Sequence, residues 1–412
     1  MIDFLYLLII AILVFNLLFS VILENINLTR KSTVLPDLIS DVYDNENYLK
    51  QQEYDKAKVR FSQIETVISS ILIILFFAFR LFGWLQSAVS VMASGLVIQT
   101  LLFFGILGIA SYLISIPFSY YSTFVIEEKF GFNKSTRKLF VIDNLKTLLL
   151  SAVIGGILIG FLTWLYTLNP NIFWIMALGV ILVFSILMNT LYSSVILPLF
   201  NRKTPLEEGE LKQKVVAFAE SLGFSINDIY LIDGSKRSTK ANAFFTGFGK
   251  RKKIFLYDTL TQNLSNDEVL AVLAHELGHY KKHHIWINLA IGLIQSTVFL
   301  YLFNLIAQST TLTQVMGGPT NMAIFYLNIV CFVLIINPIE TILGILTNAL
   351  SRKMEYSADR FASIHGLGQN LGFALKKISS LNYSDLTPHW LYVIINYSHP
   401  PLYERLKALN FT

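Results

Sequence analysis

The residues best suited to chemistry are two histidines and a glutamate in His275-Glu276-Leu277-Gly278-His279. On an α-helix, residues four apart share a face, so the two imidazoles can bind one metal ion. Glu276 follows the first histidine, where its carboxylate can accept a proton from a metal-bound water. A chance pair of surface histidines is the weaker interpretation, because the chain has only 7 histidines. The motif predicts a metallopeptidase with one catalytic Zn²⁺ per chain.

Local signals place this motif on a helix. Ser265 followed by Glu268 is a capping box, the pattern that begins many helices. We expect the helix to run through Leu277 and His284 and to continue into the apolar segment that follows.

The third metal ligand must come from elsewhere, because a catalytic zinc usually has three protein ligands and one water. Glu268 lies two turns from the motif, roughly 10 Å away. The downstream acids are Glu340, Glu355, Asp359 and Glu404. Glu355 and Asp359 share a helix face, so one can bind the metal while the other accepts a histidine N–H from behind. Ion pairs with neighbouring arginines are the alternative, and spacing alone does not rank the two acids.

The composition indicates a membrane protein. Of 412 residues, 54% are hydrophobic and 14% charged, against roughly 25% charged in soluble domains. The uncharged residues form long blocks, and crossing a bilayer takes roughly 20 residues. The blocks are residues 5–23, 64–85, 100–124, 147–168, 172–199, 285–307 and 322–350. We therefore predict an all-α membrane protein with seven transmembrane helices.

The basic residues predict the orientation of these helices. Apart from Arg80, which falls inside the second block, Lys and Arg are confined to residues 24–63, 126–146, 200–284 and 351–412. The positive-inside rule then predicts an outside N-terminus and a cytoplasmic active site. The net charge of +5 reflects this orientation rather than nucleic-acid binding. Arg80 and Glu340 are intramembrane charges to which we assign no role.

The expected domain organisation follows the blocks. Residues 1–199 hold helices one to five with loops 24–63 and 126–146, residues 200–284 form a cytoplasmic zinc-protease domain, residues 285–350 hold helices six and seven, and residues 351–412 complete the active site. Cys331 is the single cysteine, which excludes an internal disulfide and a cysteine-based metal site.

The inserted protease domain is predicted to be a small α+β unit. An amphipathic helix over residues 206–222 ends at Gly223. Three runs rich in β-branched and aromatic residues, 228–233, 241–248 and 253–257, predict short strands. Gly247, Gly249 and Lys250 suggest a hairpin between the last two. We expect a three-stranded antiparallel sheet with one free edge.

Several motifs together resemble one family. Besides the histidine motif they are FVIEEKFGFNK (124–134), LPLFN (197–201), STKANAF (238–244), SRKMEYSAD (351–359) and SHPP (398–401) with Arg405. The chain is similar over nearly its whole length to the integral-membrane CaaX prenyl endopeptidases of type I. These are the gluzincin-like zinc proteases that mature the yeast a-factor and, in animals, prelamin A.

The resemblance implies which acid binds the metal and how the helices are arranged. It implies that Glu355 is the third zinc ligand and that Asp359 supports a histidine from behind. It also implies seven tilted helices that enclose an intramembrane chamber, with the zinc at the cytoplasmic end.

The resemblance further implies how a peptide binds. Asn242, Ala243 and Phe244 would form an edge strand to which the substrate adds. His399 and Arg405 would face the cleft, with His399 and the metal sharing the developing oxyanion while Glu276 serves as general base and then general acid. From the residues alone, Asn242 is better explained as a turn or cap and His399 as a helix-start residue.

The expected function is hydrolysis of peptide bonds near the C-terminus of prenylated CaaX proteins or peptides. A quality-control zinc protease without prenyl dependence is the alternative. A transporter is remote, because the sequence has no repeated half. The expected partners are a peptide or prenylated-protein substrate and the lipid bilayer, with no nucleic acid and no obligate protein partner. The membrane is the inner membrane if the source is bacterial, and the endoplasmic reticulum or nuclear membrane if it is eukaryotic.

Overall fold

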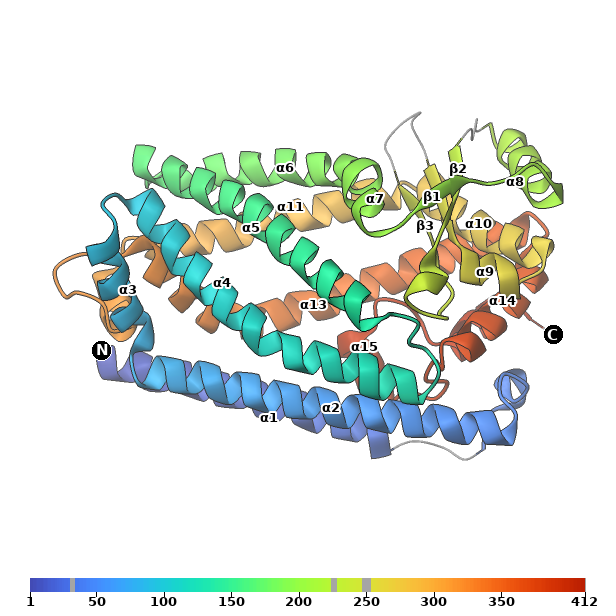
Figure 1. The fold of residues 1–412 in the computed structure, drawn as a ribbon, viewed down its shortest axis with the longest axis horizontal. Coiled ribbons are helices and arrows are strands. Elements are labelled where there is room, and N and C mark those ends of the chain that lie inside the picture. Colours follow the sequence, from blue (N-terminus) through green and yellow to red (C-terminus); the bar gives the residue numbers. More distant parts are fainter. Residues whose placement is uncertain (30–33, 224–227, 247–252, 412) are drawn as a thin grey trace.

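Among the residues that the structure describes, seven helices are long and apolar enough to cross a membrane, which confirms the predicted number. The computed structural model describes residues 1–29, 34–223, 228–246 and 253–411. The seven are α1 (Ile2–Thr29), α2 (Asn45–Ala78), α4 (Leu96–Tyr121) with the π-helical η2 (Ser122–Glu127), α5 (Arg137–Leu168), α6 (Phe173–Leu191) with the π-helical η3 (Tyr192–Ile196) and α7 (Leu197–Phe200), α11 (His284–Ile306) and α13 (Phe325–Ile364). They lie along the long axis of the molecule, with a small sheet at one end (Figure 1).

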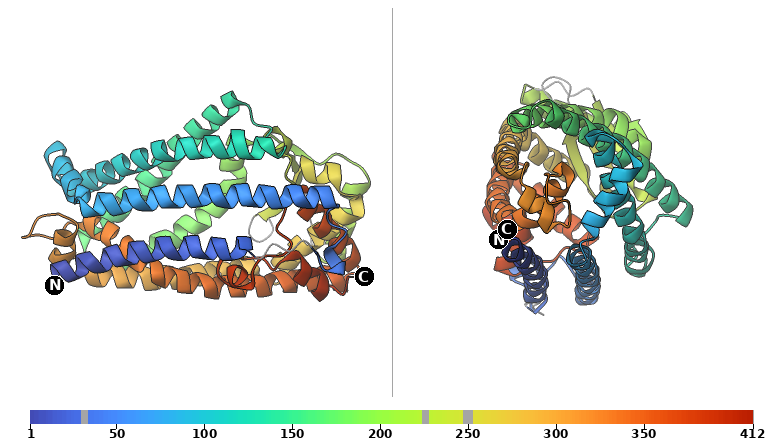
Figure 2. Two further views of the ribbon diagram at one scale, coloured as in Figure 1. Left: turned by 90° about the horizontal axis from the view of Figure 1, so that it is seen from below. Right: turned by 90° about the vertical axis from the view of Figure 1, so that its left-hand side faces the viewer.

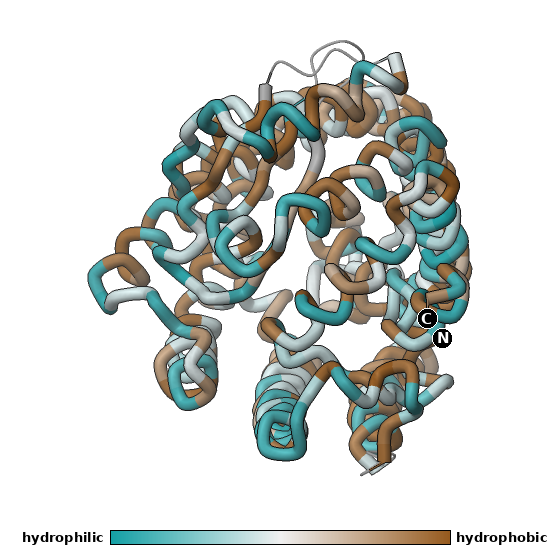
Figure 3. Tube along the Cα trace, turned by 90° about the vertical axis from the view of Figure 1, so that its right-hand side faces the viewer, coloured by the Kyte–Doolittle hydropathy of each residue, from teal (hydrophilic) through white to brown (hydrophobic). Residues whose placement is uncertain are grey.

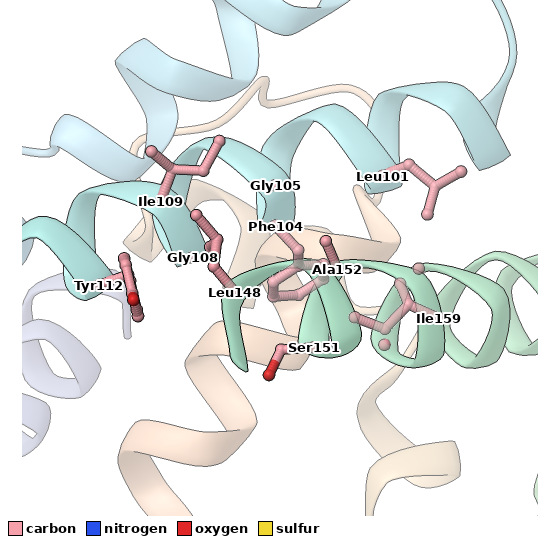
Figure 4. Close-up of a pocket in the computed structure, with 12 residues that line it drawn as sticks. Leu101, Phe104, Gly105, Gly108, Ile109, Tyr112, Leu148, Ser151, Ala152 and Ile159 are labelled. Carbon is pink, nitrogen blue, oxygen red and sulfur yellow. The ribbon is translucent and has the colours of Figure 1, made fainter. Parts of the chain in front are cut away.

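The seven helices surround the long axis, as the view along it shows (Figure 2). In the most apolar part of each helix only 6–17% of the residues are buried. Helices in a solid bundle bury one face against their neighbours, so this low burial fits helices arranged around an open interior. A cavity of about 370 Å³ lies between α4 and α5 (Figure 4). Its lining combines apolar side chains with Gly105, Gly108, Gly155 and Gly156, which have no side chain to fill the space.

The shorter helices connect the long ones or cover the sheet. They are α3 (Leu81–Met92), α8 (Glu210–Ser221), α9 (Asp258–Asn263), α10 (Asn266–Lys281), α12 (Thr310–Val315), α14 (Gly368–Leu381), α15 (Trp390–Asn396) and α16 (Leu402–Ala408), with the 3-10 turns η1 (Asp37–Ile39) and η4 (Gly234–Lys236). The amphipathic helix predicted over 206–222 is α8, and Gly223 follows it with a φ of +75°.

Arg80 does not lie inside a membrane helix, so that prediction is wrong. It separates α2 from α3 with a left-handed φ of 55°. The turn at Gly317 lies directly against it, because a Cβ atom at Gly317 would be 2.7 Å from the Arg80 Cβ. The hydropathy pattern did not reveal this break, because α3 is apolar like the span before it.

The sheet differs from the prediction in strand number and direction. Its described residues form four strands in the order β1-β2-β4-β3, namely β1 (Lys203–Pro205), β2 (Asp228–Ile232), β4 (Lys253–Tyr257) and β3 (Ala243–Thr246). The β3–β4 and β1–β2 pairs are antiparallel, but β2 and β4 are parallel. The three-stranded antiparallel sheet is therefore wrong, since side-chain alternation does not encode strand direction. The predicted hairpin residues Gly247, Gly249 and Lys250 lie outside the described residues.

The helix of the histidine motif, α10, begins where predicted. The Ser265 hydroxyl accepts from the Glu268 N–H at 3.3 Å, and the Glu268 carboxylate accepts from the Ser265 N–H at 2.7 Å. The predicted continuation into the sixth span is wrong: α10 ends at Lys281, and His283 has a left-handed φ of 58° before α11 begins at His284.

The unit that carries α10 has its own core and is joined to α2 and η2 by a partly buried charge cluster. Leu273 and Leu277 of α10 belong to one buried cluster with β4 and α14. The Lys240 ammonium donates to Glu127 at 2.8 Å and to the Tyr54 hydroxyl at 2.7 Å. These contacts join the loop before β3 to η2 and α2, so the sheet is fixed relative to the spans.

Candidate active site

Three side chains from two helices converge at the end of the molecule that carries the sheet. His275 and His279 come from α10 and Glu355 from α13. The two histidine Nε2 atoms are 3.1 Å apart, and Glu355 oxygens lie 3.2 Å from the Nε2 of His279 and 3.5 Å from that of His275. Zinc bonds of roughly 2.0–2.1 Å in a tetrahedron place ligand atoms about 3.3 Å apart. The triangle therefore has the size that one such ion requires.

The chemistry of these atoms also fits a cation. The Glu355 Oε2 atom is buried without a close hydrogen bond among the described residues, and it has a histidine nitrogen at 3.5 Å and the Arg405 guanidinium at 4.0 Å. Burial alone would lower the pKa of His275, but hydrogen bonds to Asp359 and Glu355 outweigh it and raise that pKa to about 9. Two imidazoles and a carboxylate form a donor set that zinc sites use.

Gly278 sets the distance between α10 and α13, the two helices that carry the candidate ligands. A Cβ atom at this position would lie 3.1 Å from the Ala358 Cα and 3.0 Å from the Phe361 Cβ. Both neighbours belong to α13, and one contact is with backbone. The glycine between the histidines therefore allows α13 to approach closely enough for Glu355 to reach them.

His275 is held from behind by an ion pair. Its Nδ1 lies 2.8 Å from the Asp359 Oδ1, and Asp359 accepts two hydrogen bonds from Arg405, at 2.9 and 2.6 Å. An Nδ1–H donated to Asp359 leaves the Nε2 lone pair directed at the cluster. Asp359 thus lies behind the histidine, and its other contacts are with the Arg405 guanidinium.

His279 has a corresponding support that the sequence did not reveal. Its Nδ1 lies 2.9 Å from the Nδ1 of His284, whose Nε2 lies 3.1 Å from the Ser357 hydroxyl. On a continuous helix, a residue five positions on lies about 140° around the axis and cannot make this contact. The break at His283 turns His284 back toward His279, and a pattern that assumes a continuous helix cannot detect it.

A cavity of about 480 Å³ opens onto the cluster. Its lining includes every predicted site residue except Asp359, which lies behind His275. The predicted site residues that line the cavity are Asn242, Ala243, Phe244, His275, Glu276, His279, Glu355, His399 and Arg405. The rest of the wall is mostly aliphatic, from Leu260, Val272, Leu371, Leu375 and Ile378.

His399 stands at the mouth of the cavity. Its side chain is 64% exposed, and its Nε2 lies 3.4 Å from Glu355. The preceding segment is fixed by Arg352, which donates to the Val393 carbonyl at 3.1 Å and the Tyr397 carbonyl at 2.6 Å. The next helix, α16, begins after Pro401 without a side-chain cap. A helix-start role therefore does not explain the placement of His399.

The free edge of β3 also faces this cavity. The Asn242 carbonyl accepts from the Tyr257 N–H of β4 at 3.1 Å. Because alternate residues of an antiparallel strand point their backbone groups to opposite sides, the Ala243 N–H and C=O point to the free edge. The Asn242 Oδ1 atom accepts from this same Ala243 N–H at 2.9 Å. The Asn242 side chain thus covers the first donor that an added strand would use.

A helix with two histidines and a glutamate, a carboxylate on an adjacent helix that could complete a metal site, and a strand edge beside them are typical of an integral-membrane metallopeptidase. Two family models match the chain: "CAAX prenyl protease N-terminal, five membrane helices" over residues 24–202, and "Peptidase family M48" over residues 205–412. The chain belongs to peptidase family M48, among the CAAX prenyl protease 1 proteins, and is a metalloendopeptidase. The family resemblance expected from the sequence is confirmed.

Relatives cover almost the whole chain. CAAX prenyl protease 1 of Saccharomyces cerevisiae is 36% identical over 405 residues, which span 92% of this chain and 89% of that protein. The human CAAX prenyl protease 1 homolog is 32% identical over 92% of this chain and 90% of its own length. The crystal structure of Ste24p from S. mikatae matches with a TM-score of 0.91 at 34% identity and covers 98% of both chains.

Proposed function

We propose that this chain is a zinc metalloendopeptidase that cleaves prenylated CaaX proteins or peptides near their C-terminus. The observation that carries the proposal is the triangle of His275, His279 and Glu355, which opens onto a cavity walled by a free strand edge. The names of the relatives point to the same class of substrate.

The three ligands would hold one Zn²⁺, with Asp359 and Arg405 orienting His275. When bound, zinc lowers the pKa of a coordinated water to about 7 and polarises the scissile carbonyl. Glu276 lines the cavity beside the cluster without being one of its ligands. Its carboxylate would accept a proton from the attacking water and then deliver it to the leaving amine.

The chain's own backbone would orient the peptide. An extended substrate would pair with the free edge of β3 at Asn242–Phe244, using the Ala243 N–H and C=O. The Asn242 side chain must release the Ala243 N–H for this pairing. His399, at the mouth of the cavity, would donate a hydrogen bond to the carbonyl oxygen as negative charge develops on it. Arg405 would act mainly through Asp359, which its guanidinium contacts.

The wall of the cavity supports an aliphatic substrate. Leu371, Leu375 and Ile378 of α14 face the cluster together with Val272 and Leu260. The residues between the cysteine and the last residue of a CaaX sequence are typically aliphatic, and such side chains are stabilised by burial against this wall.

The test is cleavage of matched farnesylated and unmodified CaaX peptides by the purified chain, with products identified by mass. We expect release of the three C-terminal residues from the farnesylated peptide, and none with Glu276→Gln. Equal rates on both peptides would favour the quality-control alternative. Cleavage at scattered sites would contradict the proposed position of the scissile bond.

The distribution of Lys and Arg supports an outside N-terminus and a cytoplasmic active site. A cysteine placed near Gly317 should then be labelled from outside, and a C-terminal reporter should be protected inside. Labelling on the same side at both positions would contradict this orientation.

A further inference from the structure

A second cavity, of about 340 Å³, lies between α1 and α2 and is separate from the active site. The two helices pack side by side along the molecule (Figures 1 and 2). The lining residues are Asn25, Leu28 and Thr29 of α1, and Gln52, Lys56, Arg60 and Gln63 of α2. They include two cations, three amides and a hydroxyl, with no acid among them.

The polar side chains from α2 form one stripe. Residues 52, 56, 60 and 63 follow the spacing of a single helix face, so they point into the same space. Within the described part of the chain neither Lys56 nor Arg60 forms an ion pair, whereas Lys50 on the same helix pairs with Glu46 at 2.7 Å. The cavity therefore has two positive charges without a partner from the described residues.

A buried donor points to a ligand as well. The Gln63 Nε2 atom is buried and has no hydrogen-bond partner among the described residues. The nearby acid on α1, Glu24, accepts from Ser62 at 3.2 Å through one oxygen, while its other oxygen is buried without a partner among the described residues. Glu24 lines a different cavity with Asn337 and Asn396. The cavity between α1 and α2 thus offers hydrogen-bond donors and positive charge, which suit an anion with several acceptor oxygens.

The position of the cavity indicates where that anion comes from. The apolar block of α1 ends at residue 23 and that of α2 begins at residue 64, so Asn25 and Gln63 lie at the edge of the hydrocarbon layer. Lys56 lies seven residues from Gln63, about 10 Å along the helix. The headgroup layer on each side of a bilayer is roughly 5–8 Å thick. Arg60, three residues from Gln63 and about 4.5 Å along the helix, therefore lies within the headgroup layer. Lys56 lies just beyond this layer, from where its long side chain can reach back to the phosphates. Hydrophilic and hydrophobic residues are mixed at this end of the molecule (Figure 3).

We propose that the cavity between α1 and α2 is a binding site for an anionic phospholipid headgroup. Lys56 and Arg60 hold the phosphate, Gln63 donates a hydrogen bond to one of its oxygens, and Leu28 contacts the glycerol end of the acyl chains. Clustered basic side chains at the membrane surface suit such headgroups. The site lies in the leaflet on the side of the active-site cluster, since Asn27 of α1 accepts from the His389 N–H, at 2.8 Å, just before α15.

The test is native mass spectrometry of the detergent-purified full chain titrated with phosphatidylglycerol or phosphatidylcholine. We expect one tightly retained phosphatidylglycerol per chain and weaker retention of phosphatidylcholine. Lys56→Gln/Arg60→Gln should weaken phosphatidylglycerol binding at least about tenfold. The matched control is Arg137→Gln/Lys138→Gln, two exposed basic residues at the start of α5 with the same change in charge; it should change binding less than twofold.

Three outcomes would overturn the proposal. Equal weakening in both double variants would mean general attraction to a basic surface, and no weakening in either would mean that the cavity binds no lipid. Displacement of the lipid by an equal concentration of inorganic phosphate would mean a free-anion site. Gln63→Leu tests the same site without a change in charge, so a folding defect in the double variant does not remove the test. Gln63→Leu should weaken phosphatidylglycerol binding about threefold.

Discussion

Replacing His284 tests whether the metal cluster depends on the helix break that positions this residue. In His284→Phe the ring volume is retained, but the Nδ1–H of His279 loses its acceptor at 2.9 Å. Removing such a support typically lowers metal affinity 10–100-fold, which corresponds to about 1.4–2.7 kcal/mol. A half-buried N–H without a partner costs a similar amount, about 1–3 kcal/mol. We expect the lower half of this range, because the His279 side chain is 24% exposed.

The assay is competition for zinc between the purified protein and a fluorescent chelator, with peptide cleavage measured at saturating zinc. His284→Phe should raise the zinc dissociation constant about 10–30-fold, and excess zinc should restore much of the cleavage. The control is His283→Asn, which removes the neighbouring exposed imidazole and keeps a residue that tolerates the left-handed φ. A dissociation constant within twofold of wild type for His284→Phe would refute the reasoning, as would an equal loss in the control.

Four further predictions concern the cluster and the cleft. Glu276→Gln should keep its metal and lose cleavage, whereas Glu355→Ala should lose metal itself; metal analysis giving the opposite result would reverse the two roles. His399→Ala should lower kcat roughly 10²–10³-fold with little change in KM or zinc content, and a normal kcat would exclude an oxyanion role. Asn242→Ala should uncover the Ala243 N–H and lower KM if the side chain only competes with the peptide; a KM raised tenfold would mean that it binds substrate. In metal-free protein the pKa of His275 is about 9, so zinc must displace a proton from His275 below that pH. Calorimetry of zinc binding in two buffers at pH 7 should show about one proton released. A zinc affinity that is independent of pH between 7 and 9 would contradict this.

The sequence predicted most features that depend on local periodicity. The seven apolar blocks, the capping box at Ser265 and the histidine pair depend on spacing along one helix, and all three are present. Sharing a helix face also brought Glu355 and Asp359 to the right side of α13. Which of the two acids would bind the metal and which would support a histidine depends on the helix that faces them. Only the family resemblance implied this assignment.

The features that the sequence did not predict depend on contacts between distant segments. The parallel pairing of β2 with β4 follows from the path of the chain through β3, which no alternation pattern records. The left-handed residues Arg80 and His283 interrupt stretches in which no Gly or Pro marks the break. His284 was therefore assigned no role, although its ring contacts a cluster histidine.

The break at His283 has a consequence for mechanical coupling between the bilayer and the catalytic cluster. α13 is one helix of 40 residues that has Pro338 in its interior and carries Glu355 and Asp359 near its end. A change in the tilt of the part after Pro338 therefore moves the Glu355 carboxylate directly. α10 is separated from α11 by a residue that does not continue the helical hydrogen-bond ladder. Tilting of α11 in a thinner or thicker membrane can thus be absorbed by rotation at residues 282 and 283. The two histidines can then keep their distance from Glu355, because they follow α13, against which Gly278 is packed, rather than the span that comes after them.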